Sequence, residues 1–303
     1  MAISRSQLVK ELEPGLNALF GLEYKQYENQ HEQIYTKETS DRAFEEEVML
    51  SGFGQAQVKS EGAGVSFDNA QETFTARYSH ETVALAFSIT EEAIEDNLYD
   101  RLSSRYTKAL ARSMAQTKQV KAVNPLIQGL PTTDNFDSGD GVSLFNTAHP
   151  TIAGTFQNTL TTQADLNETS LEQSLIDIAA LTDERGLKIA AKGLKLIIPS
   201  ALQFTAERLM KSAQRVGTAD NDTNAIASMG MLPQGYVVNN FLTDADAFYI
   251  TTDVPNGMKY FERAPISTKM EGDFDTGNVR YKARERYSFG VSDPRGIFGV
   301  EGA

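Results

Sequence analysis

Residues 74–121 read FTARYSHETVALAFSITEEAIEDNLYDRLSSRYTKALARSMAQTKQVK, and the spacing of their apolar side chains changes part-way along. Up to Phe87 apolar residues alternate with polar ones, with a shift of one residue near His80. Alternation predicts a strand, and the shift predicts a β-bulge. From residue 90 onward the apolar residues recur every four positions, which predicts a helix. The stretch therefore predicts an α+β fold in which a long strand leads directly into a long helix.

The helix predicted for residues 90–121 has its own start and stop signals. Ser88-Ile-Thr-Glu91 fits a capping box, and acidic residues crowd the first turns, where the helix dipole favours anions. About 32 residues at ~1.5 Å each would make a rod of roughly 48 Å, which suits a scaffold. We expect Pro125 to end the helix. Its apolar stripe is expected at Ile94, Leu98, Leu102, Tyr106, Leu110 and Met114.

The residues before this helix are predicted to protrude. Glycines punctuate residues 52–89, which we interpret as a long β-hairpin. A limb of ~15 residues spans about 50 Å, more than the radius of gyration of ~19 Å for a compact chain of this length. Because a lone two-stranded ribbon is marginal in water, the hairpin needs another surface. Residues 1–45 are polar, with a short helix expected near residues 6–20 and interrupted at Pro14, and we interpret them as an extended arm.

The second half of the chain alternates helices with strands. A capping box at Thr169-Ser-Leu-Glu172 predicts one helix, and Pro199-Ser200 predicts the start of another. Strands are expected at residues 194–198, 236–238 and 248–252. This order predicts an α+β lobe of mixed strand direction.

A basic strand is predicted near the C-terminal end. Residues 277–290 alternate strictly, so a strand would place four cations on one face, namely Arg280, Lys282, Arg284 and Arg286. These cations could contact a nucleic-acid backbone or form ion pairs with acidic groups of the same or another chain. The net charge of −13 favours ion pairing.

The composition excludes several kinds of chemistry. The chain has no cysteine and three histidines far apart in sequence, so thiolate, disulfide and Cys-ligated metal sites are excluded. No phosphate-binding glycine loop and no nucleophile elbow occurs, and His149 is interpreted as a structural, hydrogen-bonded histidine. We therefore expect no enzyme activity, no metal and no cofactor. The acidic balance argues against sequence-specific DNA binding, and the short apolar runs argue against a membrane span.

Several motifs occur in an order and spacing that resemble a known family. They are FSITEEAIEDNLY at residues 87–99, ALARS at 109–113, LFNTAHP at 144–150, DERGL at 183–187, LIIP at 196–199 and GNVRYKARERYSFG at 277–290. Over residues 45–300 the chain resembles the major capsid protein of tailed bacteriophages, in the branch similar to the Mu-like major head subunit.

The resemblance implies the Hong Kong-type capsid fold, an α+β architecture. It implies an N-terminal arm at residues 1–45 and an extended hairpin, the E-loop, at residues 46–87. A peripheral domain would comprise residues 88–128 and 258–290, with the long spine helix. An axial domain of mixed sheet and helices would comprise residues 129–257 and 291–303.

The same resemblance implies a structural role in the virion, with assembly in the host cytoplasm. Copies of the chain would form hexamers and pentamers of an icosahedral shell around double-stranded DNA. The shell would contact this DNA only weakly and without sequence specificity. The expected intersubunit contacts are Glu45, Glu46, Glu47, Lys59, Phe74 and Tyr78. Further expected partners are a portal protein, a cement protein and, because only about 45 residues precede the hairpin, a separate scaffolding protein or none. Two alternatives stay open: an encapsulin-like cargo shell, and a soluble α+β enzyme.

Overall fold

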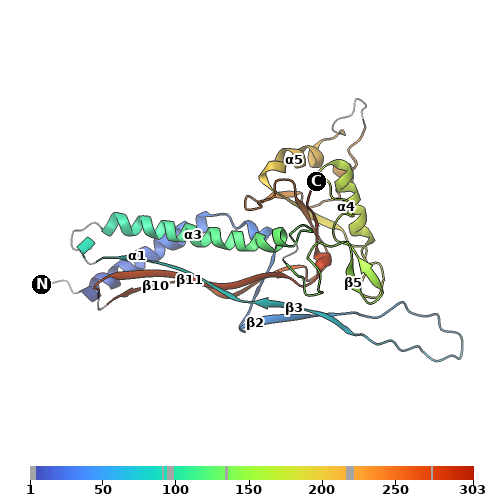
Figure 1. Cartoon of the computed structure of the whole chain (residues 1–303), viewed down its shortest axis with the longest axis horizontal. Coiled ribbons are helices and arrows are strands. Elements are labelled where there is room, and N and C mark those ends of the chain that lie inside the picture. The colour runs from blue at the N-terminus through green and yellow to red at the C-terminus, as the bar shows by residue number, and fades with distance from the viewer. Residues whose placement is uncertain (1–4, 91, 94–98, 134–135, 216–221, 274–275) are drawn as a thin grey trace.

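The computed structural model describes residues 5–90, 92–93, 99–133, 136–215, 222–273 and 276–303. The molecule is elongated (Figure 1). A long sheet and the helix α3 run side by side along it, and a second lobe, which contains the C terminus, sits at one end. A β-hairpin extends past this lobe. The predicted α+β class is confirmed.

A four-stranded sheet forms the elongated part. Its strand order is β1 (Thr36–Thr39), β10 (Met258–Gly272), β11 (Val279–Val291) and β4 (Glu81–Ile89). Strand β11 pairs antiparallel with both β10 and β4, whereas β1 pairs parallel with β10. The strand predicted at residues 277–290 is confirmed as β11, and its alternate residues from Val279 to Tyr287 are buried.

Helix α3 (Tyr99–Gln128) covers the buried face of this sheet. Leu110 and Met114 of the predicted stripe are buried against Tyr281 and Ala283, but Tyr106 is 49% exposed. Ile94 and Leu98, and the side chain of Leu102, lie outside the described residues, as does most of the predicted helix start.

The expected stop at Pro125 is wrong, because helix α3 continues through this residue to Gln128. A proline inside a helix removes one backbone hydrogen bond, and its ring crowds the carbonyl of the residue four positions earlier. Leu126 and Leu130, on the last turn and just beyond it, are buried, so tertiary packing offsets that loss.

The N-terminal residues pack on their own chain, which corrects the expectation of an extended arm. Helix α1 (Arg5–Gln26) passes through Pro14 without a break and buries Leu16 and Phe20 against α3 and β11. After a 3-10 turn, η1 (Gln30–Gln33), strand β1 adds to the sheet through backbone hydrogen bonds. This polar segment docks through Leu16 and Phe20, which lie one helical turn apart, and through the short edge strand β1.

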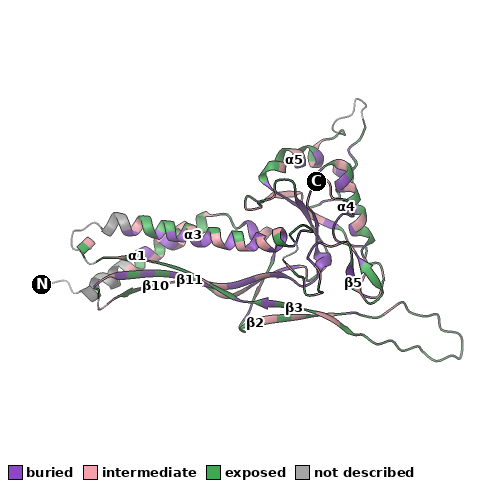
Figure 2. Ribbon diagram, in the orientation of Figure 1, coloured by how far each residue is buried: buried purple, intermediate pink, exposed green. Residues whose placement is uncertain are grey.

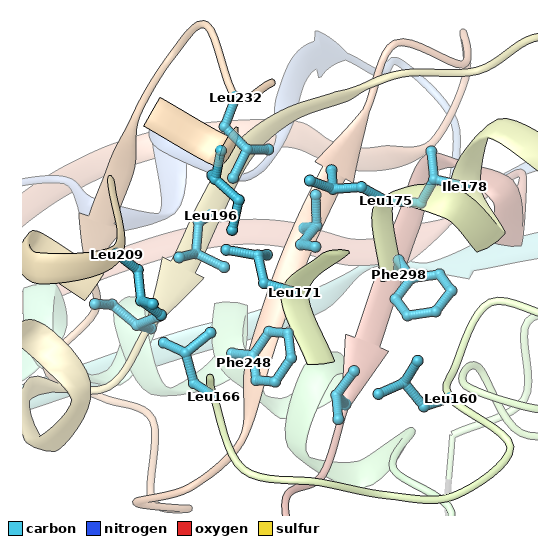
Figure 3. Packing of buried hydrophobic residues seen from close by; sticks show 14 of the residues in the cluster. Leu160, Leu166, Leu171, Leu175, Ile178, Leu196, Leu209, Leu232, Phe248 and Phe298 are labelled. Atoms are coloured by element: carbon cyan, nitrogen blue, oxygen red, sulfur yellow. The ribbon is translucent and has the colours of Figure 1, made fainter. Parts of the chain in front are cut away.

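The second lobe is built on a separate four-stranded sheet. Its order is β12 (Ile297–Val300), β9 (Phe248–Thr252), β7 (Gly193–Ile198) and β8 (Tyr236–Val238), which confirms the three strands predicted there. Helix α4 (Glu168–Ala180) buries Leu171, Leu175 and Ile178 on this sheet, and Figure 3 shows these side chains facing Leu196, Phe248 and Phe298. The observed capping box joins Asn167 to Ser170 rather than Thr169 to Glu172.

Short elements complete the lobe. They are the ribbon β5 (His149–Thr151) and β6 (Gly154–Phe156), the helices η2 (Ser200–Leu202), α5 (Gln203–Lys211) and α6 (Ala225–Met229), and the turn η3 (Pro294–Gly296) before β12. None of the described helices has both the length and the apolar composition of a membrane span.

The hairpin pairs strand β2 (Phe44–Leu50) with β3 (Glu72–Ser79). Strand β4 was expected to extend the second limb of the hairpin, but it pairs with β11 in the long sheet instead. The phase shift predicted as a bulge is the junction itself: His80 is the single residue between β3 and β4. One shifted residue thus separates a protruding ribbon from a strand of the body.

Candidate functional site

The hairpin loop, residues 51–71, exposes apolar side chains. It extends past the second lobe and is almost entirely exposed in Figure 2. Val58 and Phe67 are 98% and 97% exposed, and Phe53 and Val65 are 62% and 69% exposed. Burying one such side chain is worth about 1.5–3 kcal/mol. A group of this kind marks a surface that another molecule covers.

The two ends of the hairpin loop are anchored. The backbone N–H of Ser51 donates to the carbonyl of Gln71 at 2.8 Å, and the N–H of Gln71 donates to Ser51 Oγ at 2.9 Å. Gly54 N–H donates to Asp68 Oδ2 at 2.7 Å, a bond that lowers the pKa of this carboxyl. Among the described residues, residues 55–67 take part in no side-chain hydrogen bond or ion pair. Residues 55–67 are therefore available for contacts with another molecule.

The base of the hairpin is fixed to the long sheet through Tyr78 and His80. The Tyr78 hydroxyl lies 2.5 Å from Ser292 Oγ, and its ring packs so closely on Gly290 that a Cβ there would lie 2.6 Å from it. The ring nitrogens of His80 each lie 2.9 Å from a hydroxyl, those of Ser288 and Ser40. Burial and the nearby Arg286 lower the pKa of His80. The protruding ribbon thus leaves the body from a well-packed base.

The structure divides the residues predicted as intersubunit contacts. Lys59 lies exposed in the hairpin loop, and Phe74 is half-buried in β3. Tyr78 is only 2% exposed and contacts Phe261 and Ser292 of its own chain, so its prediction as an intersubunit contact is wrong. Phe74 and Tyr78 lie on the same face of β3, as the alternation predicts. Alternation does not show which part of that face is covered by the body of the same chain.

Glu45, Glu46 and Glu47 all lie in strand β2, so the hairpin includes Glu45, which the expected boundary placed in the arm. All three have partners within the chain. Ser40 Oγ donates to Glu45 at 2.7 Å, Arg77 lies 3.7 Å from Glu46, and Lys259 lies 2.5 Å from Glu47. Glu46 therefore joins the two strands of the hairpin, and Glu45 and Glu47 fasten the hairpin to the body.

The basic strand has the predicted arrangement. Alternate residues of β11 place Arg280, Lys282, Arg284 and Arg286 on the face of the sheet opposite α3. Arg280 pairs with Asp273 at 2.5 Å, and Arg286 Nη2 lies 3.5 Å from the carbonyl of Ala43. Lys282 and Arg284 are exposed and form no ion pair with any described residue. Three of the four cations thus have no acidic partner in the part of the chain described, and only Arg280 has one.

His149 is a structural residue, as predicted, but with partners that sequence reasoning missed. Its side chain is fully buried between Asp140 and Asn158, nine positions away on either side in sequence. Neither residue carries a motif, and only the folding of residues 137–158 brings them together. Among the described residues no group of three or more metal-ligating side chains occurs.

A protruding apolar loop on an elongated, two-part body is an assembly geometry rather than a catalytic one. The comparison of the sequence with protein families agrees: the phage capsid protein family matches residues 72–300. The chain belongs to this family. No curated protein matches the sequence.

Solved structures of shells share the fold at low sequence identity. The capsid of the cyanophage P-SCSP1u is 12% identical, with a TM-score of 0.56, covering 89% of this chain and 86% of that one. The capsid of the Myoviridae phage XM1 is 10% identical, with a TM-score of 0.54 and 89% of each chain covered. A virus-like particle from Pyrococcus furiosus is 10% identical, with a TM-score of 0.51, covering 94% and 98%.

These findings confirm the predicted family and the Hong Kong-type fold. A phage capsid protein is a structural component of the virion rather than an enzyme, so the alternative of a soluble enzyme is set aside. The Mu-like branch stays a prediction.

Proposed function

We propose that copies of this chain form hexamers and pentamers that close into an icosahedral shell around double-stranded DNA. The observation that carries this proposal is the hairpin loop, whose four apolar side chains are left uncovered by their own chain. A neighbouring copy is the surface that would cover them, since every subunit of a closed shell both offers a loop and receives one.

The parts of the chain would divide the work as the family resemblance implies. Of residues 46–87, expected as the E-loop, residues 46–79 would reach the neighbouring subunit, with Lys59 and Phe74 among their contacts, because residues 81–87 belong to strand β4 of the long sheet. The peripheral domain, residues 88–128 and 258–290, would carry α3 and the strands β10 and β11 of the long sheet. The axial domain, residues 129–257 and 291–303, would meet its copies at the centre of each capsomer. Residues 1–45 would add contacts from their docked position.

The basic strand supports ion pairing between copies. Lys282 and Arg284 face outward from the sheet, while the chain as a whole carries a net charge of −13, so another copy is a plentiful source of acidic groups. Packaged DNA would meet a predominantly acidic protein and would be held only weakly.

Replacing both cations, as Lys282→Gln with Arg284→Gln, is expected to leave the single chain as stable as before, because exposed charges contribute little to folding. Shells of this variant are expected to come apart at lower salt concentration than wild-type shells. Light scattering during a salt titration measures this. The matched control is Lys269→Gln with Lys108→Gln, whose cations are paired with acids of their own chain. Equal salt sensitivity of the two double variants would reject ion pairing by the basic strand.

The remaining partners are proposed from the family alone: a separate scaffolding protein, a portal protein and a cement protein. Cryo-electron microscopy of the purified protein tests the central proposal. Closed particles built of hexamers and pentamers would support it, and nuclease-protected DNA inside particles from infected cells would separate a genome shell from an encapsulin-like cargo shell. A chain that stays monomeric or dimeric under all assembly conditions would refute it.

A further inference from the structure

The environment of His149 is unusual because both ring nitrogens face oxygen atoms that accept hydrogen bonds. Nδ1 lies 2.6 Å from Asp140 Oδ2, and Nε2 lies 3.0 Å from Asn158 Oδ1. The imidazole ring and the Asp140 carboxyl are 0% and 2% exposed, so water cannot take the place of either partner. A neutral histidine carries one ring proton and satisfies one acceptor, whereas an imidazolium carries two.

The orientation of the Asn158 amide is fixed by the backbone around it. Its Nδ2 donates to the carbonyls of Leu144 and Pro294 at 2.7 and 3.0 Å, and its Oδ1 accepts the N–H of Asn146 at 2.9 Å. A flipped amide would place oxygen against two carbonyls and nitrogen against an N–H, and would lose all three bonds. Asn158 therefore presents an acceptor to His149.

Asp140 is equally well fixed as a carboxylate. Its other oxygen, Oδ1, accepts from Ser138 Oγ at 2.7 Å and lies 3.4 Å from the N–H of Val142. Burial alone would raise the pKa of Asp140, but the hydrogen bonds from His149 and Ser138 outweigh it and lower this pKa. The ring between Asp140 and Asn158 thus needs both of its protons to satisfy its partners.

The loop that holds Asp140 also supports the hairpin. Gly139 lies so close to β3 that a Cβ added to it would lie 2.9 Å from the carbonyl oxygen of Thr75 and 3.2 Å from Ala76 Cα. Gly139 has a φ of +97°, a conformation that favours glycine. The loop of residues 137–143 is therefore in backbone contact with the second limb of the hairpin, and its shape depends on where Asp140 is held.

A second support of the hairpin is tied to the same buried cluster. Phe156 stacks on the His149 ring with 4.8 Å between centroids, and the Arg295 guanidinium lies 4.0 Å from the Phe156 centroid. Arg295 pairs with buried Glu184 at 2.7 Å. The next residue, Arg185, donates to the carbonyl of Asn69 and lies 3.5 Å from Asp68 in the hairpin loop. Phe156 thus connects His149 to Arg295, and Arg295 to the loop that holds Glu184 and Arg185.

We propose that His149 is a positioning residue for the hairpin: with both ring nitrogens protonated it locks the loop of residues 137–143 against β3, and loss of one ring proton releases that loop. The inference concerns one folded chain and goes beyond the proposed assembly. If the hairpin joins neighbouring copies, its angle, and with it the readiness of a subunit to assemble, would depend on pH.

Other titratable groups lie near His149, and each has to be considered when protection of the hairpin is compared between pH values. The cluster contains Asp140, Asp293, Glu184 and Arg295, and the turn before β5 adds Asp137. Burial raises the pKa of Asp293 despite Arg295. Of the other two histidines, burial and then Lys118 lower the pKa of His31 to about 4, and burial and then Arg286 lower the pKa of His80.

Nitrogen-15 NMR of the histidine rings tests the protonation directly. With three histidines in the chain, each ring signal can be assigned from single variants. Because each ring nitrogen faces an acceptor, we expect His149 to show two protonated nitrogens wherever the loop of residues 137–143 is ordered. A bare nitrogen on His149 in a chain whose loop is ordered would overturn the proposal. The measurement uses the wild-type protein, and variants of His31 and His80 suffice to assign the ring signals, so no His149 variant has to fold.

Hydrogen exchange read by mass spectrometry tests the release of the hairpin. After correction for intrinsic rates, amides of residues 72–79 are expected to exchange roughly tenfold faster or more at about pH 9 than at about pH 6, while β9 stays protected. His149→Gln is expected to show fast exchange at both pH values. His149→Lys keeps a charged donor for both acceptors and is expected to restore protection and abolish its pH dependence.

The outcomes separate this inference from the proposed function. Protection of β3 that is flat with pH in the wild type, or unchanged in His149→Gln, overturns the positioning role even if shells form normally. A pH-dependent β3 in a chain that never assembles supports the role of His149 and refutes only the assembly proposal.

Discussion

A chain that lacks the hairpin loop is expected to fold normally and to form no closed shells. The variant deletes residues 53–69 and carries Ala70→Gly, so that two glycines join Ser51 to Gln71. These two residues already hydrogen-bond to each other, and Gly52 already has a φ of +62°, so a tight turn can replace the loop without moving β2 or β3. The deletion removes all four exposed apolar side chains at once.

Size-exclusion chromatography and electron microscopy measure the expected loss of particles, and circular dichroism checks the fold. A matched control keeps the loop at full length but changes Val58, Val65 and Phe67 to Ser. If apolar burial by a neighbour holds the shell, this control should assemble almost as poorly as the deletion. Normal particles from the deletion variant would show that the hairpin loop does not join subunits.

Lys118→Met is expected to destabilise the folded chain by about 3–5 kcal/mol, because it leaves a buried carboxylate without its cation. Glu285 is 1% exposed on β11 and lies 3.3 Å from Lys118 Nζ on α3. Tyr24 of α1 donates to the same carboxylate oxygen at 3.3 Å, so this ion pair lies where α1, α3 and β11 meet. Chemical denaturation at neutral pH measures the loss in the free energy of unfolding.

The pH dependence of this loss has a definite sign. Burial raises the pKa of Glu285 even with Lys118 present. A carboxyl whose pKa is raised by folding favours the folded state at low pH, and this contribution is lost as pH rises through the raised value. The deficit of Lys118→Met should therefore shrink in acid. The double variant Lys118→Met with Glu285→Gln should recover most of the stability, because no charge is left buried and Tyr24 keeps an acceptor. A Lys118→Met deficit below about 1 kcal/mol would contradict this account.

The two long elements could be predicted because each follows a single repeat. Residues 277–290 alternate because one face of their sheet is covered, and the apolar residues of α3 recur every four positions because one side of the helix is packed. The sequence-based predictions were wrong where tertiary packing outweighed a local preference of the chain. Pro125 did not stop α3, since the turn that holds it is buried.

The candidate site was predictable in part. Lys59 and the exposed loop followed from the length of the ribbon, but the split between hairpin and body at His80 did not, because β3 and β4 carry the same alternation. Tyr78 was assigned to a neighbouring copy for the same reason. A repeat shows which face a residue lies on, not which element covers that face.

The sequence by itself determined the long helix, the strands β7, β8, β9 and β11, that a ribbon protrudes, and that cations line one face of β11, since these depend on periodicity and charge along a short stretch. Only the tertiary structure decided that α1 docks on its own chain, that Lys118 and Glu285 form a buried pair, and that Asp140, His149 and Asn158 meet. Contacts of this second kind join residues from different elements. Their energies depend on exclusion from water and on distances of a few ångströms, which folding creates and no local pattern records.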